Sequence, residues 1–322
     1  MDINNTPFYT ILKSQIDHKN DLIKKESPPE NGFTISILNN KIYHTKCNGT
    51  NYQKRKKQTL ELFRAVLKKY KLKNCHININ CDKIPKNFYF NFYRVKNDHA
   101  QFLLPHHRFY YDEILLDDHE TRYDTHVTQA KELKKLDTNF KDKKNKIYFN
   151  CHTSSYKINI FKKIYSINKK SHIVKAYMCI GDSHKKNNIL HIDPSLNKIK
   201  SLVNKNMAGF EYKYFKEHCN YKYLLNEPCY INTDKIRLFL HLNAVILTRK
   251  SSYEDFYYHT LKHNVHHIEF TNYKQLHTIY NSLEKDEELC NQFIENNKTY
   301  CKEVLNQDNI LEYVALLINN IF

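Results

Sequence analysis

The sequence predicts an α/β fold of two domains, and three observations lead to this expectation. The chain has 322 residues, which suits two domains of roughly 150 residues each. Its second half alternates short apolar segments with helical patterns, at the spacing typical of a parallel sheet that helices cover on both faces. Between the halves, residues 136–146 are charged and irregular, as an interdomain linker would be.

The first half opens with a surface loop and a hairpin. Residues 18–32 are polar and contain a Pro-Pro pair, which is typical of a loop. Residues 33–40 form a strand candidate, and residues 41–46 are expected to pair with it as the second strand of a hairpin.

A helix and a strand follow the hairpin. Apolar residues recur at three- and four-residue spacing over 55–71, which predicts a helix. Residues 76–81 largely alternate polar and apolar side chains, which predicts a strand, and this strand ends at Asp82 shortly before Pro85. The segment 101–125 has a short apolar run followed by acidic residues, and we expect a loop and a short helix there.

The second half is more regular. Strands are expected at 147–149, 173–180, 223–225, 244–247 and 265–270. Helices are expected at 156–166, 208–219, 233–243, 274–283, 286–304 and 309–320. Because open parallel sheets bind ligands at the carboxyl ends of their strands, we expect a site in a cleft between the two halves.

The composition limits which binding partners and which cellular location we expect for this protein. The formal net charge of +17 attracts polyanions, but the lysines are spread along the whole chain and no nucleic-acid motif accompanies them. We therefore expect no specific nucleic-acid partner and leave weak association with anionic membranes open. The sequence has neither a run of about 18 apolar residues nor an apolar signal segment, so we expect no transmembrane helix and a cytoplasmic location.

Three segments of the second half resemble one known family. They are HCNYKYLLN (218–226), NTDKIRLFLHLNAVIL (232–247) and SSYEDFYYHTLKHNVHHIEF (251–270). From about residue 74 to its C-terminus, the chain resembles glycosyltransferase family 90. This family includes protein O-glucosyltransferases and transferases that modify capsules and lipopolysaccharides.

The resemblance implies a GT-B fold, with two Rossmann-like domains facing a central cleft. We expect an acceptor-side domain at 1–140, a nucleotide-sugar-binding domain at 141–305, and a C-terminal helix at 306–322 that could pack back on the first domain. The implied reaction moves a sugar, with glucose or xylose favoured, from UDP to a hydroxyl of a glycan or protein with inversion. It implies no metal and no cofactor beyond the UDP-sugar donor.

Asp82 is the expected catalytic residue. The family places an aspartate after the corresponding strand, shortly before a proline, and assigns it as the general base. Inverting transfer requires the acceptor hydroxyl to lose its proton as it attacks the sugar. The alternative is a turn residue that ends a strand before a proline.

Two donor-binding positions follow from the family's Ser-x-Arg motif, which Thr233 and Lys235 occupy here. A cation in the first turn of the helix expected there would stabilise the departing diphosphate. Lysine keeps the charge of the family's arginine and loses its bidentate geometry. The alternatives are an ordinary helix cap for Thr233 and a solvated lysine for Lys235.

Other donor-loop positions depart from the family. The family's Arg-Gly is Asn150-Cys151 here, followed by His152, and Cys229 replaces a glycine before the Ser-x-Arg motif. Glycine lets the backbone approach phosphate closely, so these changes leave open a weakened member that binds glycans or a partner protein. Asp255 matches an acidic position that could hold a ribose hydroxyl; its alternative is a solvated acid at a helix start.

No metal site is expected. Residues 106–107 (His-His) and 117–118 (Asp-Asp) lack a convincing set of further ligands. His266 and His267 are expected to be partly buried histidines with hydrogen-bond partners, in preference to residues that point into the cleft.

Overall fold

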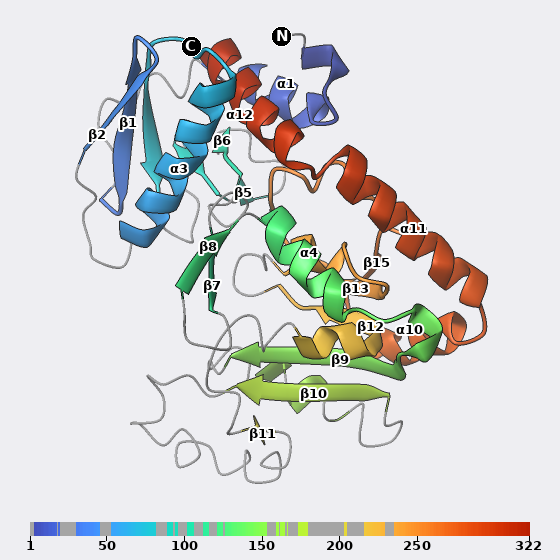
Figure 1. The fold of residues 1–322 in the computed structure, drawn as a ribbon. Coiled ribbons are helices and arrows are strands. Elements are labelled where there is room, and N and C mark those ends of the chain that lie inside the picture. The colour runs from blue at the N-terminus through green and yellow to red at the C-terminus, as the bar shows by residue number, and fades with distance from the viewer. Residues whose placement is uncertain are drawn as a thin grey trace.

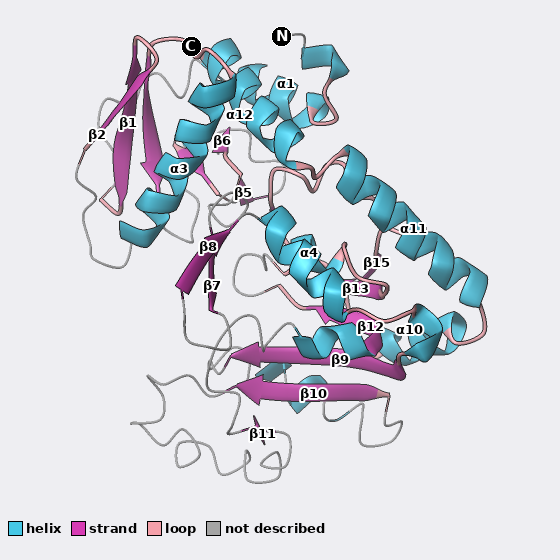
Figure 2. Cartoon of the chain, in the orientation of Figure 1, coloured by secondary structure: helices cyan, strands magenta, loops and turns pink. Residues whose placement is uncertain are grey.

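The computed structural model shows two β-sheets at opposite ends of the molecule, with helices around and between them (Figure 1; Figure 2). It describes residues 3–17, 19, 30–45, 53–81, 89–92, 94–95, 102–105, 112–115, 121–124, 126–152, 159–160, 162–164, 166, 173–179, 203–204, 216–228 and 235–322. The first sheet comes from the first third of the chain, and the second sheet begins at residue 144.

The first sheet is mixed and has the strand order β2-β1-β3-β4-β6. Its strands are β1 (Gly32–Leu38), β2 (Lys41–His44), β3 (Cys75–Asn80), β4 (Phe90–Asn91) and β6 (Phe102–Leu103). β1 is antiparallel to both β2 and β3, whereas β4 is parallel to β3 and β6. The two residues between β1 and β2, Asn39 and Asn40, have φ angles of 50° and 61°, the positive values that a tight hairpin turn of this kind requires. The predicted hairpin is therefore confirmed.

One face of this sheet is buried under helices α1 (Tyr9–Asp17), α3 (Gln53–Lys69) and α12 (Gln307–Ile321). Phe33, Ile35 and Ile77 on the strands belong to the same core as residues of all three helices. The C-terminal helix α12 packs against both α1 and α3 (Figure 1). Residues from the two ends of the described chain thus complete one core.

The other face of the first sheet carries polar side chains. Thr34 Oγ1 donates to Asn78 Oδ1 at 2.7 Å, and Ser36 Oγ lies 2.8 Å from His76 Nδ1. These cross-strand pairs satisfy polar groups of neighbouring strands, so this face does not need an apolar cover.

The prediction for residues 101–125 is wrong. β6 and a separate antiparallel hairpin of β7 (Asp112–Leu115) and β8 (Thr121–Asp124) take the place of the expected loop and short helix. Strands of two to four residues are too short for their periodicity to show in the sequence. Helix α4 (His126–Leu136) begins directly afterwards, while residues 106–107 and 117–118 lie outside the described residues.

The second sheet is entirely parallel, as predicted. Its strands are β9 (Lys144–His152), β10 (Val174–Cys179), β11 (Val203–Asn204), β12 (Tyr221–Asn226), β13 (Val245–Arg249) and β15 (Ile268–Phe270). Their order is β11-β10-β9-β12-β13-β15. Counted within this half, that is 3-2-1-4-5-6, the order of doubly wound nucleotide-binding sheets. The α/β class is confirmed, and two separate sheets with this topology agree with the GT-B architecture.

Both faces of the second sheet are buried. Along β9, Ile147 and Phe149 enter a core with helices α10 (Gln275–Leu283) and α11 (Glu287–Glu303). Tyr148, between them, faces the opposite way and joins the core that continues into the first half. The three predicted C-terminal helices are confirmed by α10, α11 and α12, and the sheet is held rigidly from both sides.

Two helix predictions in the second half are only partly met. The helix expected at 233–243 is reduced to the short α9 (Ile236–Phe239), followed by turns. Most of 208–219 lies outside the described residues, and a 3₁₀ turn, η6 (Glu217–Asn220), ends it.

The segment expected to be a linker is a packed joint. Its residues 137–143 include the 3₁₀ turn η4 (Phe140–Asp142), and Lys143 forms a fully buried ion pair with Asp137. Asp137 Oδ2 also accepts the backbone N–H of Asn243 at 2.6 Å. Burial lowers the pKa of Lys143, and the charge of Asp137 opposes part of that change. This connection is therefore fixed to the second half of the molecule.

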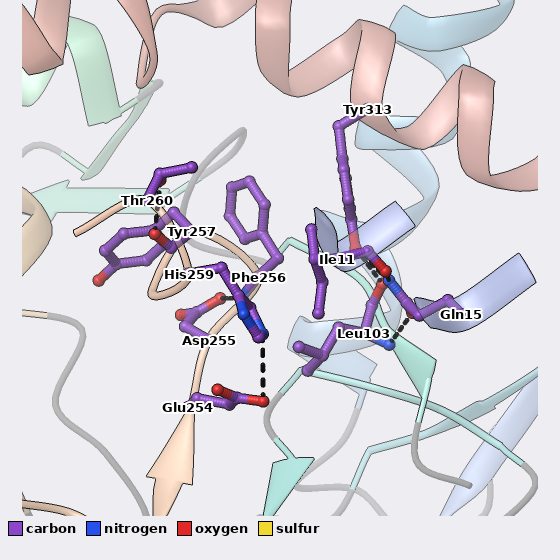
Figure 3. Close-up of polar contacts among 10 residues, drawn as sticks. All are labelled: Ile11, Gln15, Leu103, Glu254, Asp255, Phe256, Tyr257, His259, Thr260 and Tyr313. Atoms are coloured by element: carbon purple, nitrogen blue, oxygen red, sulfur yellow. Dashed lines mark hydrogen bonds and ion pairs between the residues drawn. The ribbon is translucent and has the colours of Figure 1, made fainter. Parts of the chain in front are cut away.

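A second joint is made by the segment after β13. There, β14 (Tyr253–Glu254) pairs antiparallel with β5 (Arg94–Val95) of the first half. The ring of Phe256 lies 5.0 Å from that of Tyr313 on α12, measured between centroids (Figure 3). It also lies 5.2 Å from the ring of Phe8, the residue before α1. The second half is thus anchored on α12 and on the residue that precedes α1.

A hydrogen-bond network stabilises the elements that receive Phe256. Gln15 Nε2 donates to the Tyr313 hydroxyl at 2.7 Å, and that hydroxyl donates to the carbonyl of Leu103 at 3.0 Å (Figure 3). The side-chain oxygen of Gln15 accepts the backbone N–H of Leu103. α1, α12 and β6 are therefore held together by polar as well as apolar contacts.

Cys75, Cys81, Cys219, Cys290 and Cys301 are buried, free thiols. Burial raises the pKa of Cys75, Cys219 and Cys301 to about 12, so these thiols are protonated and unreactive at neutral pH. Among the described residues, no helix has the length and apolar character needed to cross a bilayer.

Candidate functional site

The topology of the second sheet identifies its carboxyl edge as the place for a ligand. In the 3-2-1-4-5-6 order, the connections from the first and fourth strands leave in opposite directions and open a crevice at the carboxyl ends. Here those strands are β9 and β12. Two predicted donor-binding residues, Cys151 and His152, end β9, and Lys235 follows β12.

Lys235 reaches across this switch point to the end of β9. Its Nζ donates to the carbonyl of Asn150 at 2.7 Å and lies 3.4 Å from the Asn150 side-chain oxygen. Asn150 is buried, and its amide nitrogen lies 3.3 Å from the Tyr148 hydroxyl. Because these two oxygens are neutral, the contacts fix the position of the ammonium group without cancelling its charge. The structure therefore argues against a merely solvated lysine.

A row of buried polar side chains crosses the same edge of the sheet. Asn150, Asn226 and Thr248 lie at the carboxyl ends of adjacent strands, and Asn226 is in register with Thr248. Neighbouring strands are about 4.8 Å apart, so the row extends over roughly 10 Å. The Thr248 hydroxyl has no hydrogen-bond partner in the described structure, which is unusual for a core and more common at functional sites.

A cluster around Glu227 was missed by the sequence reasoning. This buried carboxylate accepts Arg249 Nη1 at 2.7 Å and the Tyr273 hydroxyl at 2.6 Å. Burial raises the pKa of Glu227, and the bonds from Tyr273 and Arg249 oppose the change. Glu227 comes directly after β12 and Arg249 ends β13, so their position at strand ends was the available signal. The cluster fixes the start of the connection that leads to Lys235.

Asp255 belongs to the joint between the halves. Its side chain is 1% exposed, and its Oδ1 accepts the backbone N–H of Phe256 at 2.8 Å (Figure 3). It follows β14 and starts no α-helix, so the alternative of a solvated acid at a helix start is wrong. Neighbouring Glu254 lies 3.4 Å from His259 Nε2. The ribose-binding role of Asp255 stays a prediction.

Five predicted site residues have no described side chain. Asp82, Thr233 and Cys229 lie outside the described residues. Cys151 and His152 are placed by their backbone in β9, and their side chains are not described. The geometry thus brings Cys151, His152 and Lys235 to one switch point, while Asp255 lies on a different segment.

His266 is a buried, hydrogen-bonded histidine, as expected, whereas the Nδ1 atom of the buried His267 has no hydrogen-bond partner in the described structure. Lys262 donates its backbone N–H to His266 Nδ1 at 2.9 Å, and the His266 ring lies 4.7 Å from the Tyr300 ring. Burial lowers the pKa of His266 to about 4, with smaller effects of the same sign from His267 and Lys262. His266 is therefore neutral at physiological pH.

Comparison with known proteins gives one extended match. The family model for glycosyl transferase family 90 matches residues 12–321, nearly the whole chain. No curated protein matches the chain.

Solved structures resemble the chain more distantly. Anabaena HepE, crystallised with UDP-glucose, is 11% identical over 59% of this chain and 51% of its own, with a TM-score of 0.40. A glycosyltransferase from Rickettsia africae is 14% identical over 59% of this chain and 52% of its own, with a TM-score of 0.39. The chain thus spans about half the length of these two proteins. At such scores the similarity says nothing of donor or acceptor.

Proposed function

This chain belongs to glycosyltransferase family 90, and from that membership we propose that it transfers glucose or xylose from a UDP-sugar to a hydroxyl of a glycan or protein. The observation that carries the proposal is the contact between Lys235 and Asn150 at the switch point of the second sheet. Inversion, independence of metal and a cytoplasmic setting are parts of the same proposal.

In this proposal, the donor diphosphate lies beside the Lys235 ammonium group. As the sugar–phosphate bond breaks, negative charge grows on the leaving UDP, and a fixed cation stabilises it most at that moment. A family arginine would offer two parallel donors, whereas Lys235 acts as a point charge positioned by Asn150. Asn150 thus has a new role at a position where the family has an arginine.

Asp82 would act from the first half. The acceptor oxygen attacks the anomeric carbon on the face opposite the leaving phosphate, and its proton passes to the Asp82 carboxylate. The new carbon–oxygen bond forms as the bond to UDP breaks, which gives inversion. Support comes from the position of Asp82 two residues after the end of β3, a parallel partner of β4.

A second function is favoured by the altered donor loops. Cysteines stand at two positions where the family has glycine, which lets the backbone approach phosphate closely. This change would weaken donor binding, and a weakened member would act by binding glycans or a partner protein.

Calorimetric titration with UDP, UDP-glucose and UDP-xylose tests the proposal. Saturable binding of one UDP-sugar is expected, and Lys235→Gln should weaken it by about tenfold to a hundredfold, because a charge-assisted contact is lost. Lys285→Gln, which removes an exposed lysine of the same half, is the matched control and should bind as the wild type. Absence of binding to every UDP-sugar would overturn the transferase and leave the second function.

A further inference from the structure

A surface groove of about 620 Å³ lies on the first half, between the edge strand β2 and helix α3. Its lining includes Lys41, Ile42, His44, Arg64, Leu67 and Lys68. It lies at the β2 edge of the first sheet, whereas the switch point lies on the second sheet.

The floor of the groove is apolar. Ile42 from the strand and Leu67 from the helix are partly buried and pack against the main core from opposite sides of the groove. A ligand that lies here would therefore cover apolar surface as well as polar groups.

The walls of the groove are mainly basic. Lys41 stands on the strand side, and Arg64 and Lys68 stand one helical turn apart on the other side. The single carboxylate of the lining, Glu61, is paired with Arg64. Three cations against one carboxylate leave a positive rim on both sides of the apolar floor.

The strand itself offers a further binding element, because β2 is the terminal strand of its sheet and pairs with β1 alone among the described strands. Its side chains are largely exposed; Tyr43 is 53% exposed. A terminal strand presents backbone N–H and C=O groups that a further strand can pair with.

We propose that this groove binds an extended acidic segment of a partner protein, which adds to β2 as another strand. An apolar side chain of the segment covers Ile42 and Leu67, and flanking carboxylates meet Lys41 on one side and Arg64 with Lys68 on the other. β2 has four residues, so about 13 Å of the partner is paired. The apolar floor, and Glu61 within the rim, favour such a segment over a uniformly charged polyanion.

Fluorescence anisotropy tests the inference on the full chain. The probe is a fluorescein-labelled nonapeptide of alternating glutamate and valine, titrated at low ionic strength. Saturable binding is expected, and it should weaken as salt is added because the charged contacts are exposed. A second peptide has the same side chains but N-methylated alternate amides, and it should bind at least fivefold more weakly because it cannot pair with β2.

Charge-reversal variants locate the binding. Lys41→Glu with Lys68→Glu should weaken peptide binding at least tenfold. Lys131→Glu with Lys134→Glu makes the same change in charge on the exposed surface of α4 and should leave binding within about twofold. Thermal unfolding of each variant checks that the fold is retained.

Three results would overturn the inference. Equal binding of the N-methylated peptide would exclude strand addition. Equal loss in both charge variants would show attraction to net charge alone. Displacement of the peptide by a heparin oligosaccharide or single-stranded oligonucleotide at equal or lower concentration would make the groove a general polyanion site.

Discussion

The two sheets of the molecule place their polar side chains differently. The parallel second sheet is buried on both faces, and its polar residues gather at the carboxyl ends of strands, as Asn150, Asn226 and Thr248 do. The mixed first sheet buries one face under three helices and carries hydrogen-bonded pairs such as Thr34–Asn78 on the other.

This difference shows what each topology permits. A parallel sheet needs cover on both faces, so its polar chemistry is confined to one edge, where a ligand meets rigidly held groups. A mixed sheet with antiparallel edge strands can leave a polar face and an open edge. We therefore expect substitutions in the second half to affect donor binding and stability, and those in the first half to affect transfer and partner recognition.

The largest effect should come from the catalytic base proposed in the first half. Asp82→Asn should lower transfer by about 10³-fold, because the acceptor hydroxyl loses its proton acceptor, and should leave UDP-sugar binding unchanged. Transfer is measured by UDP release and binding by calorimetry. Asp17→Asn, an exposed aspartate of the same half, is the control. Unchanged transfer by the Asp82 variant would remove the base role.

The joint at 137–143 should be the next most sensitive. Asp137→Ala leaves the Lys143 ammonium group buried without its partner, which should cost about 3–5 kcal/mol in the free energy of unfolding, measured in urea. Asp142→Ala, in the same segment but exposed, should cost less than about 0.5 kcal/mol. If both variants lose little, the segment is a tolerant linker after all.

The buried second half should also show a pH dependence. Folding lowers the pKa of His266 from 6.5 to about 4, so the unfolded chain binds the proton more tightly. Its contribution to stability is complete above pH 6.5 and is lost as the pH falls towards 4, by on the order of 3 kcal/mol. His266→Gln should remove this part of the loss in denaturation curves between those pH values.

His277 is the matched control for that measurement, because it is exposed on α10. His277→Gln should leave the pH dependence as it is in the wild type. If His266→Gln retains the full pH dependence, another group is responsible.

The smallest effect should be found on the polar face of the first sheet. Ser36→Ala removes one exposed hydrogen bond to His76 and should cost less than about 1 kcal/mol. Ile35→Ala, at the preceding residue, which is directed into the core, should cost about 2–5 kcal/mol. Similar losses in the two variants would mean that the two faces of this sheet are equally buried.

The second half was more predictable than the first because its strands are long and helices separate them. The segments expected at 147–149, 173–180 and 244–247 correspond to β9, β10 and β13, with boundaries shifted by a few residues. In contrast, β6, β7 and β8 are too short to show a periodic pattern of apolar residues. They are strands because β6 pairs with β4 and β7 pairs with β8.

The resemblance to the family predicted which residues belong to the candidate site, but it could not predict which of them contact one another. Lys235 and Asn150 were identified as counterparts of family residues, yet their hydrogen bond joins residues 85 positions apart and depends on the order of β9 and β12. Glu227 and Arg249 were missed because their ion pair exists only once β12 and β13 lie side by side. The buried ion pair of Asp137 and Lys143 was not predicted, because charged residues in a sequence usually indicate a solvent-exposed segment.

The packing of α12 against α1 and α3 has a consequence for how the protein is made. A ribosome releases the chain in order, at about 5–20 residues per second, so roughly 15–60 seconds separate the appearance of α1 from that of α12. Phe8, Ile11 and Leu12 stay without their final apolar cover during that interval. The core of the first half is therefore completed only after the second half has been synthesised, so the first half cannot reach its final packing as an independent N-terminal unit.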